Sequence, residues 1–170
     1  MHNWGRANRV SFDAGKEHLV VLHPREYHGD PFKLLGCTID LDLRMHTCID
    51  QLLSKIRSKS TAILRTRAYY DSSKLLDQYK SRVWGLVEAH CGAYFHAATS
   101  LLNKIGQVQE AFLHKLGISE TQAFLDFNFA PTAVRRNIAA LGILHKRVLG
   151  LCHPSFAKLL PWYDEHLPEG

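Results

Sequence analysis

The sequence has no long apolar run, and none of its stretches approaches the roughly 18 consecutive apolar residues that indicate a membrane span. Its N-terminal stretch, MHNWGRANRV, also lacks the apolar segment of a signal peptide. The chain contains no internal repeat and no low-complexity tract, which argues against a repeat array or a disordered linker. These absences predict a folded chain with no membrane span.

Cysteine is scarce and scattered, at Cys37, Cys48, Cys91 and Cys152. No two of these residues form the closely spaced pair that zinc sites use, so we predict no metal site in this chain. Buried, reduced thiols in an intracellular protein are the simpler expectation. The sequence also has no Ser-His-Asp arrangement, P-loop or dinucleotide fingerprint, which removes the most familiar enzyme classes.

The chain does have an ordinary globular composition, with 46% hydrophobic and 22% charged residues among 170. A chain of this length buries roughly two-thirds of its unfolded surface, which is enough for one domain with a real core. The formal net charge of +5 favours a polyanionic partner.

Short β-prone runs occupy the first part of the chain, at 9–13, 17–23 and 32–39. The second and third runs are separated by a loop with one glycine and two prolines, so we expect them to form a hairpin. Gly36 interrupts the third run. A glycine inside a strand marks either a bulge or a place where another backbone or a ligand comes close.

Helical periodicity begins near residue 43 and continues to about residue 150, and the final stretch, DEHLPEG, is expected to be a frayed tail. A first helix follows directly, and a second is expected to begin at Asp71 or Ser72. A third spans about 99–116 and ends at Gly117, and Ser119 is the expected N-cap of a short fourth helix. A fifth covers about 130–150. The predicted fold class is therefore α+β and mostly α, with a small antiparallel hairpin followed by a helix bundle.

The first helix is strongly basic. Between 44 and 67 the sequence holds one acid, Asp50, against six basic residues: Arg44, Lys55, Arg57, Lys59, Arg65 and Arg67. Such a broad stripe can follow a nucleic-acid backbone without reading its sequence. It can equally be the solvated face of an ordinary helix, and the sequence does not decide between the two.

Two stretches carry a family resemblance: NRVSFDAGKEHLVVL at 8–22, and FKLLGCTIDLDL at 32–43, which runs into the basic helix. In this order they resemble the end of the palm and the thumb of a non-LTR (LINE-like) retrotransposon reverse transcriptase. The helical stretches at 79–97, 107–117 and 130–150 are similar to the region that follows the polymerase core in such elements. The resemblance covers nearly the whole chain.

The resemblance implies roles for several residues. Asn8, Phe12 and Lys16 match a strand-turn-strand motif in which the lysine assists the leaving pyrophosphate as an auxiliary catalytic group. Leu35 and Gly36, with Ile39 and Asp40, match the primer grip, where the glycine lets the backbone approach the primer. The implied division is palm end and primer grip at 1–42, thumb-like helices at 43–117, and a C-terminal helical region at 118–170.

The resemblance also implies partners: an RNA template, a DNA primer, and the palm and fingers of the intact polymerase, in the nucleus or cytoplasm. The family holds Mg²⁺ with an aromatic-x-Asp-Asp hairpin, and no such sequence precedes Asn8. We therefore expect the chain alone to be inactive and to bind no cofactor. Asp40 and Asp42 are expected to be turn or helix-cap residues.

The remaining candidates are expected to be structural. Trp84, Tyr94 and Phe95 are predicted core residues, and the helix at 130–150 is predicted to pack on the bundle with basic ends. Two other functions stay open on the sequence. One is a non-catalytic helical nucleic-acid-binding module or a degenerate retroelement relic, and the other is a purely structural interaction bundle.

Overall fold

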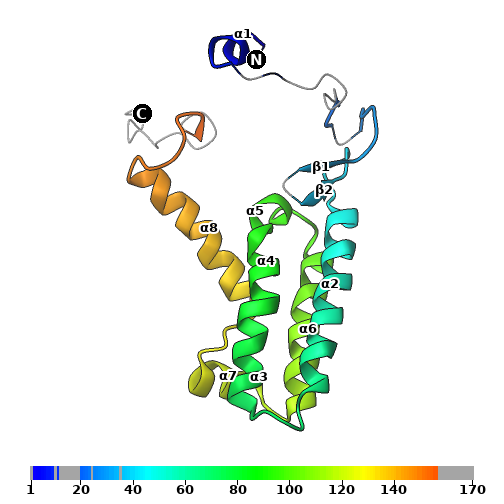
Figure 1. Ribbon diagram of the computed structural model, residues 1–170, viewed down its shortest axis with the longest axis vertical. Helices are drawn as coiled ribbons and strands as arrows, with labels where there is room; N and C mark the ends of the chain where they lie inside the picture. Colours follow the sequence, from blue (N-terminus) through cyan, green and yellow to red (C-terminus); the bar gives the residue numbers. More distant parts are fainter. Residues whose placement is uncertain (1, 10, 12–19, 24, 35, 157–170) are drawn as a thin grey trace, which may run out of the picture.

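The computed structural model describes residues 2–9, 11, 20–23, 25–34 and 36–156. It is mostly helical, with one small antiparallel sheet of two strands (Figure 1). The predicted fold class, α+β and mostly α, is confirmed. Within the described residues, no helix combines the length and the apolar character needed to cross a bilayer.

Three long helical segments lie side by side and form the bundle (Figure 1). The first is α2 (His46–Arg65). The second is continuous through α3 (Ser72–Tyr79), a π-helical turn η2 (Lys80–Trp84) and α4 (Gly85–Ala89). The third is α6 (Thr99–Leu116), which runs parallel to α2.

Shorter elements complete the described chain. They are α1 (His2–Ala7) at the N-terminus, α5 (Cys91–Tyr94) above α4, and α7 (Glu120–Phe127) at the opposite end of the bundle. The last helix, α8 (Thr132–Val148), begins against the bundle and leans away from it toward its C-terminal end (Figure 1).

The run at 32–39 is a complete hairpin, not one strand. β1 (Phe32–Leu34) pairs with β2 (Cys37–Ile39), and the pairing of Leu34 with Cys37 leaves a two-residue turn. Gly36 occupies that turn at φ +86°, a left-handed conformation that glycine adopts without strain. The prediction that 17–23 would pair with 32–39 is wrong for the described part of 17–23, where Val21 bridges His28 instead.

The expected helix boundaries are confirmed by their capping contacts. The Asp71 carboxylate accepts a hydrogen bond from the Lys74 amide at 2.8 Å, and the Ser119 hydroxyl accepts one from the Gln122 amide at 3.1 Å. Gly117 ends α6 in the left-handed conformation. Two of these helix ends are therefore set by side-chain caps and the third by the left-handed backbone of a glycine.

The core lies between the three long helices and is rich in aromatic contacts. Tyr79 packs on Phe112 with ring centroids 4.5 Å apart, and Trp84 stacks on Phe129 at 4.6 Å. Trp84 and Tyr94 are buried, as predicted. The prediction for Phe95 is wrong, because its side chain is 42% exposed after the end of α5.

The expectation of reduced thiols is wrong for Cys37 and Cys48, which form a disulfide between β2 and the first turn of α2. Their Cα atoms are 5.6 Å apart, a separation typical of disulfides, and both residues are buried. The tight turn between hairpin and helix brings them together, which spacing along the chain does not reveal. Cys91 and Cys152 are free thiols.

We expect reduction of this disulfide to lower the free energy of unfolding by up to about 3 kcal/mol, because the bond closes a short loop in the unfolded chain. Urea denaturation followed by circular dichroism, with and without a thiol reductant, measures the difference. A Cys37→Ser/Cys48→Ser variant should be insensitive to the reductant, whereas Cys152→Ser should respond like the parent protein. Equal stability of the parent protein with and without reductant would contradict the pairing.

Candidate nucleic-acid interface

The five basic residues predicted on and after α2 are all solvent-exposed. The core-facing side of this helix carries Ile49, Leu52, Leu53 and Ile56, so periodicity alone directs the charged positions outward. Among the described residues, none of the five forms an ion pair with a carboxylate. Their charges are therefore available to an anion: Lys55, Arg57, Lys59, Arg65 and Arg67.

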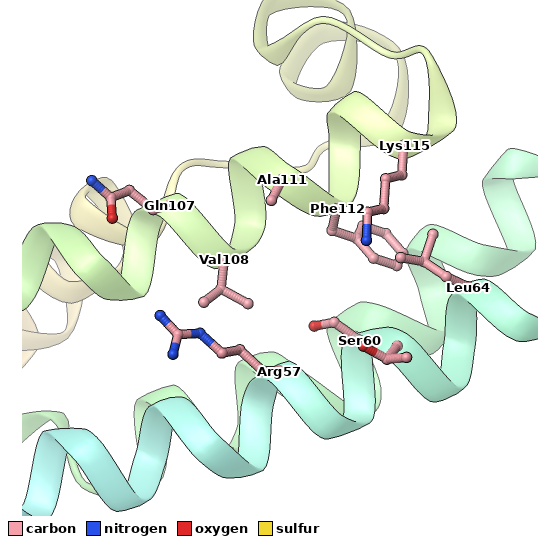
Figure 2. Close-up of a pocket in the computed structure, with 9 residues that line it drawn as sticks. Arg57, Ser60, Leu64, Gln107, Val108, Ala111, Phe112 and Lys115 are labelled. Carbon is pink, nitrogen blue, oxygen red and sulfur yellow. The ribbon is translucent and has the colours of Figure 1, made fainter.

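A groove of about 220 Å³ runs between α2 and α6. Arg57 extends into it from α2 and Lys115 from α6, toward opposite ends (Figure 2). Its floor is apolar, formed in part by Leu64, Val108 and Phe112. None of the described residues that line the groove is acidic, so no carboxylate there neutralises the charges of Arg57 and Lys115.

The predicted basic stripe is divided between two flanks of α2. Arg57 lines the groove toward α6, whereas Lys55 lines a separate small pocket with Leu86 of α4. Lys59 follows Lys55 by one helical turn, and Arg65 lies about 15 Å along the axis from Lys55. Arg67 follows the end of α2. The structure therefore places the cations around the helix and not in a single row.

The hairpin turn lies beside Lys55. Gly36 and Lys55 line the same pocket of about 20 Å³, together with His90, which precedes α5. A Cβ atom added at Gly36 would lie 3.5 Å from the His90 Cε1 atom, which is ordinary van der Waals contact. The pocket holds at most about one water molecule, so it is a packing contact and not a ligand cavity.

Three of the residues named from the resemblance lie outside the described residues: Lys16, the auxiliary catalytic candidate, Leu35 of the primer grip, and Phe12. The primer-grip motif is therefore described only at Gly36, Ile39 and Asp40.

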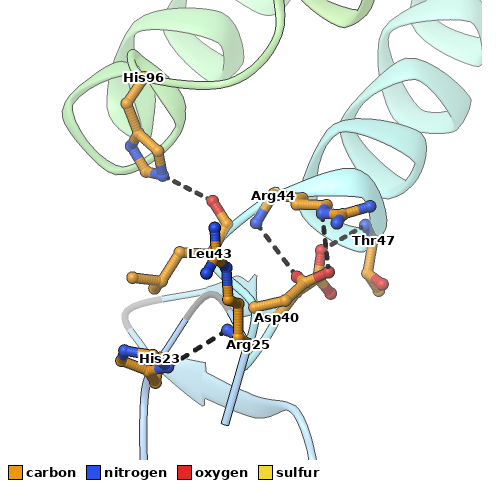
Figure 3. Close-up of polar contacts among 8 residues, drawn as sticks. His23, Arg25, Asp40, Leu43, Arg44, Thr47 and His96 are labelled. Carbon is orange, nitrogen blue, oxygen red and sulfur yellow. Dashed lines mark hydrogen bonds and ion pairs between the residues drawn. The ribbon is translucent and has the colours of Figure 1, made fainter. Parts of the chain in front are cut away.

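The hairpin is fastened to α2 by two contacts besides the disulfide. The Thr38 hydroxyl donates a hydrogen bond to the Gln51 side-chain carbonyl at 3.0 Å. The Asp40 carboxylate accepts one from the Thr47 amide at 3.1 Å and so caps the start of α2 (Figure 3). These contacts fix the direction in which the helix leaves the hairpin.

Asp42 is also a turn residue. Its carboxylate accepts a hydrogen bond from the Arg44 amide at 3.1 Å and pairs with the Arg44 side chain at 3.3 Å (Figure 3). The prediction that Asp40 and Asp42 serve as cap and turn residues is confirmed. In the portion of the chain that the structure describes, no group of three His, Cys, Asp or Glu side chains could hold a metal ion.

Cys91 is the one free thiol that lies in the core near this region. Burial, and secondarily the nearby Glu88 carboxylate, raise the pKa of the Cys91 thiol above its usual value. A raised pKa keeps the thiol protonated and weakly nucleophilic at neutral pH. Cys91 is therefore a poor candidate for a nucleophile.

Sequence reasoning missed the contribution of α6. Lys115 supplies the second cation of the groove, and Gln107 supplies an amide at its other end. Gln107, Ala111 and Lys115 are spaced four residues apart, so they share one face of a helix. That spacing was present in the sequence, but nothing local shows that this face lies beside Arg57.

We expect Gly36→Ala to lower the free energy of unfolding by about 1 to 2 kcal/mol, because an L-residue is strained at the positive φ of this turn. The matched control is Gly142→Ala in α8, where the added methyl meets open space. That change should stabilise by up to about 1 kcal/mol, since alanine favours helix. Equal effects of the two substitutions in urea denaturation would contradict the assigned turn.

The two flanks of α2 therefore carry different features: the glycine hairpin turn beside Lys55 on one, and the groove of Arg57 and Lys115 on the other. Exposed cations of this kind can contact phosphate groups by charge. No protein-family model matches the chain, and neither a curated protein nor a solved structure shows significant similarity to it.

Proposed function

We propose that this chain is the C-terminal part of a non-LTR-type reverse transcriptase, comprising the palm end, primer grip, thumb and following helices. In this role it binds the duplex of RNA template and DNA primer. The observation that carries the proposal is the place where the β1–β2 hairpin meets the basic helix α2. The Gly36 turn is fastened beside Lys55, and Lys59 continues this exposed basic flank one helical turn further along α2.

The surface is suited to a duplex backbone because its cations are spread out and unpaired among the described residues. Phosphates recur along each strand, so contacts at Lys55 and Lys59, one helical turn apart, can follow the backbone without reading bases. In the groove, Arg57 and Lys115 lie toward opposite ends, so each can contact a different phosphate group. Gly36 leaves the hairpin turn without a side chain, so a primer backbone can come close to it.

The chain's own contribution in this proposal is binding and orientation. Mg²⁺, when bound by palm aspartates of an intact enzyme, would stabilise the charge of phosphoryl transfer. The carboxylates of Asp40 and Asp42 do not fit that role, because both are engaged with backbone amides in the turn before α2. Lys16 would assist the leaving pyrophosphate only in the intact enzyme.

The proposal places the protein in the nucleus or cytoplasm, where thiols are usually kept reduced. Reduction of the Cys37–Cys48 disulfide in such a compartment would leave two buried thiols. The Thr38–Gln51 and Asp40–Thr47 hydrogen bonds would still hold the hairpin against α2 under these conditions.

We expect the chain to bind a short RNA–DNA hybrid with a recessed primer end, with a dissociation constant of roughly 1 to 100 μM at physiological salt. The Arg57→Gln/Lys115→Gln variant should bind more weakly and reduce the slope of log affinity against log salt by about 2. Fluorescence anisotropy of a labelled hybrid over a salt series measures both. The matched control is Lys74→Gln/Arg82→Gln, which removes two exposed charges outside the groove.

Two results would count against the proposal. If no salt-dependent binding occurs, the chain is not a nucleic-acid-binding protein of either kind. If binding occurs but a blunt DNA duplex binds as well as the recessed hybrid, the chain behaves as a general nucleic-acid-binding module and not as a primer grip. If the groove variant and the control lose the same amount of affinity, binding depends on the net charge of the chain and not on the groove.

A further inference from the structure

A polar cleft of about 370 Å³ lies where α6, the start of α7 and the start of α8 meet. Of its described lining residues, only Gln107 also lines the groove between α2 and α6. The helix α7 supplies Glu120 to the cleft, and α8 supplies Thr132, Ala133 and Arg136. The cleft therefore carries charged groups of both signs.

The start of α8 is held in place beside this cleft. The buried Gln109 side chain donates a hydrogen bond to the Ala130 carbonyl at 3.0 Å and accepts one from the Trp84 indole N–H at 3.1 Å. The Arg135 guanidinium lies 3.7 Å above the Trp84 ring and pairs with the Glu88 carboxylate of α4. These contacts fix the first turn of α8 against α6, so the cleft is preformed.

Thr132, the first residue of α8, lines the cleft with a hydroxyl that the fold does not use. The residue is 5% exposed, and its side chain makes no hydrogen bond with any part of the chain that the structure describes. The Thr132 Oγ1 atom faces Gly106 of α6, at 3.5 Å from the position that a Cβ atom there would take. Buried hydroxyls usually have a hydrogen-bond partner, so an open one that lines a cleft points to a ligand.

The first turn of α8 adds free backbone donors beside this hydroxyl. Its N-cap is Pro131, which has no side-chain oxygen to accept a hydrogen bond, and no side chain caps the helix. The first amide of α8 with an acceptor is that of Arg135, which donates to the Pro131 carbonyl at 3.1 Å. Among the described residues the amides of Thr132 and Ala133 therefore have no acceptor and, with the Arg136 guanidinium, can bind a carboxylate.

Two carboxylates lie next to these donors. The Glu110 Oε1 atom lies 3.8 Å from the same Gly106 Cβ position, so this carboxylate and the Thr132 hydroxyl flank one point. Glu120 lines the cleft from the first position of α7. Within the described ranges, neither glutamate nor Arg136 forms an ion pair. Groups that bind a carboxylate and groups that bind an ammonium ion therefore lie close together, as the two ionic groups of an α-amino acid do.

We propose that this cleft binds a free basic α-amino acid such as lysine. The first-turn amides of α8 and Arg136 hold the ligand carboxylate, and Glu110 holds its α-ammonium group. The Thr132 hydroxyl, which both donates and accepts, lies between these two sites. The cleft carries two carboxylates and one guanidinium, so the carboxylate of Glu120 is left for the side-chain ammonium group. This inference does not depend on whether the chain binds nucleic acid.

The test compares three probes by isothermal titration calorimetry with the full chain: L-lysine, cadaverine, which lacks the carboxylate, and 6-aminohexanoate, which lacks the α-ammonium group. We expect lysine to bind roughly tenfold more tightly than either fragment, because each fragment loses a charge-assisted contact. The proposal is overturned if lysine does not bind. It is also overturned if cadaverine binds as tightly as lysine, which would show a general cation site, or if 6-aminohexanoate does.

Three substitutions test the assignment of the cleft. Thr132→Val and Glu110→Gln keep the size of the side chain, and each should weaken lysine binding by roughly fivefold or more. Gly106→Ala should also weaken it, because the added methyl group occupies the point between the Thr132 hydroxyl and the Glu110 carboxylate. The new contacts are at ordinary van der Waals distances and alanine favours helix, so this variant should fold.

The matched controls are Asp126→Asn, which removes an exposed carboxylate of α7 outside the cleft, and Gly142→Ala, whose methyl group meets open space in α8. Both should bind lysine like the parent protein, and circular dichroism of each variant checks that the helices are retained. If the cleft variants bind lysine as tightly as these controls do, the cleft is not the site and the proposal fails.

Discussion

The position of Trp84 is the constraint on which the arrangement of the helices depends. Its indole N–H donates to the Gln109 side chain of α6, and Gln109 in turn donates to the Ala130 carbonyl before α8. The ring stacks on Phe129 and carries the Arg135 guanidinium on its surface. One side chain therefore joins the central helical segment to α6, to the α7–α8 connection and to α8, with every buried polar atom of Gln109 engaged.

The candidate interface and the uncovered side of α8 both follow from this arrangement. Because α6 is held against the central segment, its Lys115 face lies beside Arg57 of α2 and closes the groove. Because Arg135 fixes the start of α8, apolar side chains such as Ile138 and Leu141 lie exposed on the side of that helix away from the bundle, and the predicted packing of α8 holds for one side only. The two surfaces lie on different helices.

A second, local set of contacts governs the hairpin. The disulfide, the Thr38–Gln51 hydrogen bond and the Asp40 cap all join the hairpin to the first two turns of α2. These contacts hold the turn at Gly36 in a fixed position relative to the cations of α2. The position of the Gly36 turn relative to α2 thus does not depend on the distant α8.

The sequence by itself determined the features that are local. Apolar spacing located the long helices, and Asp71, Ser119 and Gly117 set their ends, because a cap acts within a few residues of itself. It left Gly36 ambiguous between a bulge and a close approach of another backbone or a ligand, and it did not predict that the glycine lies in the turn of a hairpin. Only the tertiary structure decided which faces meet: the pairing of Cys37 with Cys48, the groove of Arg57 and Lys115, and the uncovered side of α8. Periodicity shows that a face is apolar or charged, but the surface that packs against it comes from residues distant in the chain.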